Sequence, residues 1–237
     1  MLSRSTYASS GNVFVIGGKH AARRSVHSPR DCHFSLSRRY HKLTLIGQPT
    51  DQHLVLMRSE ILTKTPNLVI RRGHARDAAL LADLGARTFT ETFAPDNSPE
   101  DMTAYLKTAF SPAQQRTELA DHETSFLIAE SNGVAVGYAM LRSGNVLENV
   151  TGENPIELVR LYVSQDRLGS GVGAALMQAC IREASERGHR TLWLGVWEHN
   201  ARAQAFYRSW NFTEIGTHVF HLGNDPQTDL LMQRTIS

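Results

Sequence analysis

Residues 163–177 read Val163-Ser-Gln-Asp-Arg-Leu-Gly-Ser-Gly-Val-Gly-Ala-Ala-Leu-Met177 and join an apolar strand to an amphipathic helix. Three glycines stand on alternate positions between the two, at Gly169, Gly171 and Gly173. Such a turn lets a phosphate approach the main chain, and the N–H groups and dipole of the following helix attract its charge. The stretch therefore predicts a site for a phosphorylated ligand. The alternative is a glycine-rich turn that binds nothing.

Two common phosphate motifs do not fit these glycines. A Walker A loop needs Lys followed by Ser or Thr after its last glycine, and neither pair is present here. The dinucleotide-binding fingerprint Gly-x-Gly-x-x-Gly fails because the glycines are spaced two and two. That fingerprint also expects an acid at the end of the next strand, about 20 residues on. Glu186 lies near that distance but is predicted to end the helix.

A second informative stretch follows at residues 191–212. Its first part, Thr191-Leu-Trp-Leu-Gly-Val-Trp197, is apolar at nearly every position, as expected for a central strand with both faces buried. Asn200 is then a good N-cap for a helix. One face of that helix is apolar at spacing i, i+3, i+4 and i+7, through Ala203, Phe206, Tyr207 and Trp210.

Together these stretches resemble the GNAT family of acyl-CoA N-acyltransferases. The glycines resemble its pyrophosphate loop, Arg/Gln-x-x-Gly-x-Gly/Ala, except that Leu168 stands at the Arg/Gln position and Arg167 comes one residue earlier. Residues 200–212 resemble its second motif, Asn-x-x-Ala-x-x-Phe-Tyr-x-x-x-Gly-Phe. Asn211 replaces the glycine there, and Asn tolerates the left-handed conformation of a helix C-cap.

The end of the chain is similar to one branch of that family. Residues 193–200 and 218–232 resemble the bacterial PaiA type, which are spermidine/spermine N-acetyltransferases and their relatives. The resemblance extends from about Leu68 to the end of the chain, with its motifs in the right order and spacing.

The resemblance implies an α/β protein with the GNAT acyl-CoA N-acyltransferase fold, a mixed and mostly antiparallel sheet of about seven strands flanked by helices. The sequence pattern fits this fold, with start signals for two helices at Ser98 and Ser111 and a hairpin turn at Asn132-Gly133. The expected strands are 68–72, 125–130, 134–141, 156–163, 190–197, 213–222 and 227–234. The longer helices are expected at 75–93, 172–187 and 201–210.

The resemblance also implies acetyl-CoA as cosubstrate. Strand residues 161–163 would pair with the pantetheine arm through their backbone, as an added strand does. Asn200 would hydrogen-bond the pantetheine arm. The alternatives are an ordinary, fully paired strand at 161–163 and, for Asn200, simple helix capping. The expected cofactor-binding residues are Leu161, Tyr162, Val163, Leu168, Gly169, Ser170, Gly171, Val172, Gly173, Ala174, Asn200 and Tyr207. No metal is expected.

Two residues are expected to be catalytic. The family places its general acid, near the CoA sulfur, at the position of Tyr207; the alternative is a Tyr packed in the core with its hydroxyl satisfied. Glu157 begins the strand before the loop and is the candidate base, acting directly or through water. The alternatives are a solvated charge at a strand end and proton loss to bulk water.

The implied function is transfer of an acetyl group to a primary amine, a polyamine such as spermidine or spermine being the acceptor that the branch suggests. A protein or peptide N-acetyltransferase and an acyl-CoA-binding regulatory module without turnover are the alternatives. No nucleic acid or membrane partner is expected, and a homodimer is consistent with the family. The charge does not indicate a nucleic-acid partner, because residues 1–50 carry +7 and the remainder −5.

The first 56 residues form a basic, Ser/Arg-rich extension, and the GNAT domain is expected at residues 57–237. The extension has three readings: a disordered tail, a transit peptide, or sequence outside the natural protein, with translation starting at Met57. We favour the third. Cys32 and Cys180 show no metal-ligand spacing, and Cys180 falls on an apolar helix face, so a reducing cytoplasm is the expected location.

Overall fold

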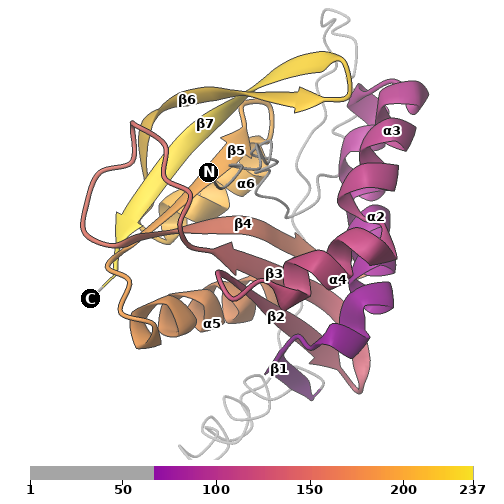
Figure 1. Cartoon of the computed structure of the whole chain (residues 1–237), viewed down its shortest axis with the longest axis horizontal. Coiled ribbons are helices and arrows are strands. Elements are labelled where there is room, and N and C mark those ends of the chain that lie inside the picture. Colours follow the sequence, from indigo (N-terminus) through magenta and orange to yellow (C-terminus); the bar gives the residue numbers. More distant parts are fainter. Residues whose placement is uncertain (1–66, 237) are drawn as a thin grey trace, which may run out of the picture. The chain divides into compact units, whose positions relative to one another are not determined.

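A computed structural model describes residues 67–236. Within this range the strands form one seven-stranded sheet in the order β1-β2-β3-β4-β5-β7-β6 (Figure 1). Neighbouring strands are antiparallel except for the parallel pair β4 and β5. The mixed, mostly antiparallel sheet that the sequence predicted is therefore confirmed. The strands are β1 (Leu68–Arg72), β2 (Thr124–Ser131), β3 (Val134–Arg142), β4 (Pro155–Val163), β5 (Thr191–Trp197), β6 (Thr213–Leu222) and β7 (Asp225–Thr235).

Helices cover both faces of this sheet. Helix α5 packs on one face of β1–β4, and α2 and α4 pack on the opposite face of β2–β4 (Figure 1). Three single turns of 3-10 helix, η1 (Ala75–Asp77), η2 (Ala94–Asp96) and η3 (Gln165–Arg167), complete the set. The α-helices are α2 (Ala78–Phe93), α3 (Pro99–Ala109), α4 (Pro112–Ala120), α5 (Val172–Glu186) and α6 (Ala201–Ser209).

The helix starts that the sequence predicted are present. The Oγ of Ser98 accepts a hydrogen bond from the N–H of Asp101 at 3.1 Å, and the Oγ of Ser111 accepts one from Gln114 at 3.1 Å. Each hydroxyl satisfies a first-turn N–H group that has no acceptor inside the helix. The two helices that begin at these caps, α3 and α4, lie on the face of the sheet opposite α5.

Left-handed residues form the predicted turns. Asn132 and Gly133 have φ values of 52° and 77° and close the hairpin between β2 and β3. Both positions of a two-residue hairpin turn require positive φ, which explains the Asn-Gly pair. Asn211 has φ of 62° after α6, so it does adopt the conformation expected of a glycine there.

One predicted helix differs at its start. The segment at 75–93 begins as the 3-10 turn η1 before continuing as α2. The Asp77 carboxylate accepts hydrogen bonds from the backbone N–H of His74 and from the guanidinium of Arg71 in β1. These bonds tie the first turn to the neighbouring strand. The sequence pattern indicates helical periodicity but does not show this side-chain contact between Asp77 and Arg71, six residues earlier.

The prediction for residues 1–56 lies outside the described residues. Between residues 67 and 236, no helix has the length and apolar character needed to cross a bilayer.

Candidate active site

The glycine loop leads into the start of α5 with its backbone in a left-handed conformation. Gly169 and Gly171 have φ values of 76° and 91°, a conformation that side chains other than glycine adopt only with strain. The first helical hydrogen bond of α5 runs from the N–H of Ala175 to the carbonyl of Gly171 at 3.0 Å. The N–H groups of residues 172–174 therefore have no acceptor within the helix and point out at its positive end.

A cavity of about 290 Å³ opens at this helix end. Six of the predicted cofactor-binding residues line it: Val163, Leu168, Gly169, Gly171, Gly173 and Ala174. The sequence analysis did not assign the other three lining residues, Arg167, Arg202 and Phe206, to the site. Arg202 lies two positions after the N-cap of α6. A basic residue in the first turn of that helix was the sequence feature that could have indicated its place at the cavity.

The cavity explains how the loop can lack the usual Arg or Gln. Leu168 is half-buried and packs against the hydrophobic core, and its N–H donates to the carbonyl of Gln165 at 3.4 Å. Arg167 before the loop and Arg202 from α6 also line the cavity, and the Nε of Arg167 donates to the carboxylate of Asp166 at 3.2 Å. The two arginines and the helix end together suit a ligand with several phosphate charges.

A wedge opens between the parallel strands β4 and β5. They pair only at Pro155–Thr191, Ile156–Leu192 and Glu157–Trp193. Beyond this point β4 stays paired with β3 as far as Val163, and β5 stays paired with β7 as far as Trp197. The facing edges of residues 158–163 and 194–197 thus have no strand partner in the described part of the chain. We call this gap the β4–β5 wedge.

The hydrogen-bond pattern shows which groups of β4 face the wedge. Ser164 donates its N–H to the carbonyl of Val136 on β3 at 2.9 Å. Paired residues of antiparallel strands alternate between bonding each other and bonding outward, so Tyr162 bonds to its β3 partner Tyr138. The N–H groups of Leu161 and Val163 consequently point outward, into the wedge.

Tyr207 lies on α6 and is 1% exposed. Its ring packs edge-on against Phe206 and Phe212, with ring centroids 5.5 and 5.7 Å away. Burial, with a smaller contribution from Cys180 on α5, raises the pKa of Tyr207 well above its usual value. The phenol is therefore protonated at neutral pH, and its role as general acid stays a prediction.

Residues 86–212 match the sequence profile of the acetyltransferase (GNAT) family. The chain belongs to this family. It is 35% identical over 160 residues to an uncharacterised N-acetyltransferase of Mycobacterium tuberculosis, covering 68% of this chain and 98% of that protein. The GNAT members named in this comparison are N-acetyltransferases, and the chain is an N-acetyltransferase as well.

Solved structures show the same fold. The PaiA N-acetyltransferase of Thermoplasma acidophilum, solved in complex with coenzyme A, is 19% identical with a TM-score of 0.57, covering 71% of this chain and 99% of that one. A ribosomal-protein-alanine N-acetyltransferase of Brucella melitensis is 27% identical with a TM-score of 0.51, covering 70% and 99%. These matches confirm the predicted GNAT fold.

Several predicted residues lie near the cavity without lining it. Asn200 caps α6, its Oδ1 accepting from the N–H of Ala203 at 3.0 Å, so its capping role is present. Ser170 is exposed, and its hydroxyl donates to the carbonyl of Arg167 at 2.6 Å. Val172 is buried in the core by its side chain, which leaves its N–H as the group that can reach a ligand.

Glu157 is not a solvent-exposed charge at a strand end. It is 1% exposed, and its Oε2 accepts a hydrogen bond from Arg142 Nη2 at 2.9 Å. The reading of Glu157 as a solvated charge is therefore wrong, and its role as base stays a prediction. Among residues 67–236, no group of three or more His, Cys, Asp or Glu side chains could hold a metal ion.

Proposed function

We propose that this GNAT member transfers an acetyl group from acetyl-CoA to a primary amine. The observation that carries the proposal is the continuity between the cavity at the start of α5 and the β4–β5 wedge, because Val163 belongs to both. The diphosphate of CoA would bind the free N–H groups of residues 172–174, beside Arg167 and Arg202. The pantetheine arm would then enter the wedge as an added strand along β4.

The wedge would also hold the reacting thioester. The outward N–H groups of Leu161 and Val163 can donate to its carbonyl oxygen and to the oxyanion that forms after attack. Such donors are effective because they are fixed in place and shielded from water. When the C–S bond breaks, the protonated phenol of Tyr207 can give its proton to the departing thiolate.

The acceptor would approach from the opposite face of the sheet, which carries α2, α3 and α4. Glu157 points to this face, since it lies directly opposite Trp193 and Arg142 on the neighbouring strands. The proposal retains Glu157 as a candidate proton acceptor. Its ion pair with Arg142 already balances its charge, which argues for testing it against other carboxylates.

A polyamine is the acceptor that the PaiA-type resemblance suggests, and the fold of the Thermoplasma PaiA protein supports it at the level of architecture. A peptide N-terminus is the second candidate, supported by the 27% identical ribosomal-protein-alanine N-acetyltransferase. The acid Asp101 is engaged elsewhere, since it accepts hydrogen bonds from Ser98 and from the N–H of Asn224. Asp101, in the first turn of α3, therefore gives the polyamine no support beyond the resemblance.

Thiol release from acetyl-CoA by the full chain tests the proposal, with spermidine, spermine, amino acids and a short peptide as acceptors. Turnover with polyamines or with the peptide alone would select the acceptor class. Tyr207→Phe should lower kcat by about 10²-fold while the Kd for acetyl-CoA, measured by calorimetry, stays within about twofold. The matched control is Tyr138→Phe, which removes another buried hydroxyl, one without a hydrogen bond among the described residues. Bound acetyl-CoA without turnover on any acceptor would instead favour a regulatory module.

A further inference from the structure

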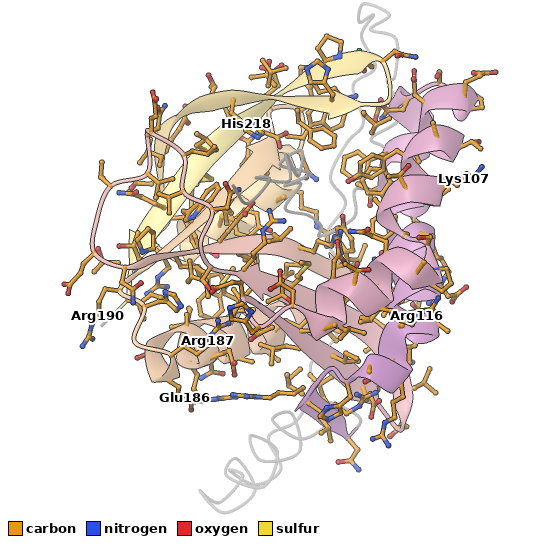
Figure 2. The ribbon with its side chains drawn as sticks, viewed as in Figure 1. Lys107, Arg116, Glu186, Arg187, Arg190 and His218 are labelled. Atoms are coloured by element: carbon orange, nitrogen blue, oxygen red, sulfur yellow. The ribbon has the colours of Figure 1, made fainter. Side chains whose placement is uncertain are left out.

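A buried carboxylate that the sequence analysis did not single out lies on the acceptor face. Asp229 of β7 stands directly opposite Trp197 of β5 and His218 of β6. Directly opposite residues project from the same face of a sheet, so these three side chains form a row. The ring of Trp197 lies 5.8 Å from that of Phe93 in α2, which places the row on the face of α2 and α3. Figure 2 shows His218 at the β6–β7 arm of the sheet.

Gly195 makes room for this carboxylate. The residues two positions before and after it on the same face of β5 are tryptophans, Trp193 and Trp197. A Cβ atom at Gly195 would lie 3.2 Å from Oδ2 of Asp229, so the carboxylate occupies the space that a side chain would fill. Trp193 is the last β5 residue that pairs with β4. The Asp229 carboxylate therefore lies over Gly195, within the part of β5 that borders the β4–β5 wedge.

The surroundings make this carboxyl basic. Asp229 is 1% exposed. Burial, together with the nearby carboxylate of Glu198, raises its pKa to about 8. The titratable groups that face it are Glu198 after β5, Tyr105 from α3, whose own pKa Asp229 helps to raise, and His218 from β6. A base with a pKa close to the working pH is efficient, because it is basic enough to remove a proton and still ionised in part.

We propose that Asp229 is the general base of the acetyl transfer. The inference rests on the proposed function. It places the base on the acceptor face and the acid, Tyr207, on α6 at the other side of the wedge. Glu157 lies on the same face as Asp229 and is ion-paired with Arg142.

In the proposed reaction, protons pass through Asp229 and Tyr207. The ionised carboxylate of Asp229 takes a proton from the acceptor ammonium, and the freed amine attacks the thioester carbon to form a C–N bond. The C–S bond then breaks, and Tyr207 donates its proton to the thiolate. The tyrosinate recovers a proton from the nitrogen of the new amide, and Asp229 releases its proton to solvent. The net products are the acetamide, CoA thiol and one proton.

The test is the pH dependence of kcat/KM for acetyl-CoA with spermidine, or with the short peptide if that is the acceptor turned over. The wild-type rate should rise with a step near pH 8 as Asp229 ionises. Asp229→Asn should lower kcat/KM about 10²-fold at pH 8 and, with spermidine, lose that step, its residual rate following the amine pKa near 10. With the peptide, whose α-amino group itself titrates near 8, the roughly 10²-fold loss of rate is the deciding result. Acetyl-CoA affinity should stay within about twofold, because the carboxyl lies away from the glycine loop.

Two variants serve as comparisons. Asp225→Asn removes an exposed carboxylate from the same strand and should behave as wild type. Glu157→Gln should retain the step near pH 8. Loss of the step in Glu157→Gln, or its retention in Asp229→Asn with a rate within threefold of wild type, would overturn the assignment to Asp229.

The other possible results also decide whether Asp229 is the base. If Asp229→Asn does not fold, Gly195→Ala becomes the deciding variant: it keeps the carboxyl but crowds it, and should lower kcat about tenfold with the step kept. An unchanged kcat in Gly195→Ala would then overturn the inference. A wild-type protein that turns over no amine removes the proposed function and this role together. Turnover by the wild type together with an unchanged rate in Asp229→Asn would overturn only the role of Asp229 as base and leave the proposed function standing.

Discussion

Asp229 should reduce the stability of the folded chain at the pH where it acts. Its pKa is about 8 in the folded state against 3.8 normally, so between about pH 4 and pH 8 the folded state holds a proton that the unfolded state has released. The free energy of unfolding therefore falls as pH rises through this window. Asp229→Asn should remove that fall and raise stability by a few kcal/mol at pH 9, since each pKa unit corresponds to about 1.4 kcal/mol. Urea unfolding at pH 5 and pH 9 measures it, and an equal difference between variant and wild type at both pH values would contradict it.

Leu168 should contribute little to cofactor affinity through its side chain. The proposed anion site consists of backbone N–H groups with Arg167 and Arg202 beside them, while Leu168 packs against the core. Leu168→Arg, which installs the residue common in the family, should tighten acetyl-CoA by less than tenfold, or about 1.4 kcal/mol. Calorimetry decides this, and a larger gain would mean that the two existing arginines do not replace the missing one.

Arg202 should contribute a salt-dependent part of that affinity. Its side chain lines the cavity and is exposed at the surface, where a charged contact is worth at most about 1 kcal/mol. Arg202→Ala should weaken acetyl-CoA binding about threefold to fivefold, and less at high salt. Arg208→Ala, one and a half turns further along α6, is the matched control and should leave the Kd unchanged. Equal losses in both variants would point to a general charge effect.

The elements of this fold could be predicted because their signals are local. Ser98 and Ser111 cap helices through hydrogen bonds to their hydroxyls. Asn132-Gly133 turns a hairpin and Asn211 follows α6, each in a left-handed conformation that these residue types tolerate. The glycine loop was predictable for the same reason. A position that requires positive φ, or one that caps the first N–H groups of a helix, can be identified from its own residue type without knowledge of its contacts in the fold.

The two-sided site was not predictable in the same way, because it depends on pairing between distant strands. The sequence cannot show that β4 and β5 pair at only three positions, or that Gly195 of β5 lies beneath Asp229 of β7, 34 residues on. Glu157 could be placed on its strand, but its ion-pair partner, Arg142 of β3, could not be identified from the sequence. Arg202 was the exception, since its place in the first turn of α6 was visible in the sequence.

The two ends of α5 allow a test of what the loop contributes as an element. Gly171 before the helix and Gly188 after it both have positive φ, 91° and 82°, with open space where a Cβ would lie. Gly171→Ala and Gly188→Ala should therefore each cost about 1 kcal/mol of stability through backbone strain. Only Gly171→Ala should also weaken acetyl-CoA binding, because only that end carries the anion site. Equal Kd values in the two variants would remove the loop from the cofactor site.

On the scale of the whole domain, the sheet separates the two halves of the proposed reaction. The glycine loop and Tyr207 lie with α5 and α6, and Asp229 and Glu157 project from the face covered by α2 and α3. The β4–β5 wedge is the place where the two sides meet. In the proposed function the donor and the acceptor would enter from opposite directions, so neither would need to leave before the other binds.

All the parts of this proposal lie between residues 67 and 236, and we propose that residues 57–237 form the acetyltransferase domain. The mycobacterial relative supports this, because the 160 matched residues make up 98% of that protein. A variant starting at Met57 should therefore unfold at the same denaturant midpoint as the full chain. Acetyl-CoA at a hundredfold excess over its Kd should stabilise both by about 2.7 kcal/mol, the amount that ligand binding to the folded state alone provides. Urea melts with and without acetyl-CoA measure both quantities. A smaller gain in the shortened chain would show that residues before Met57 contribute to the cofactor site.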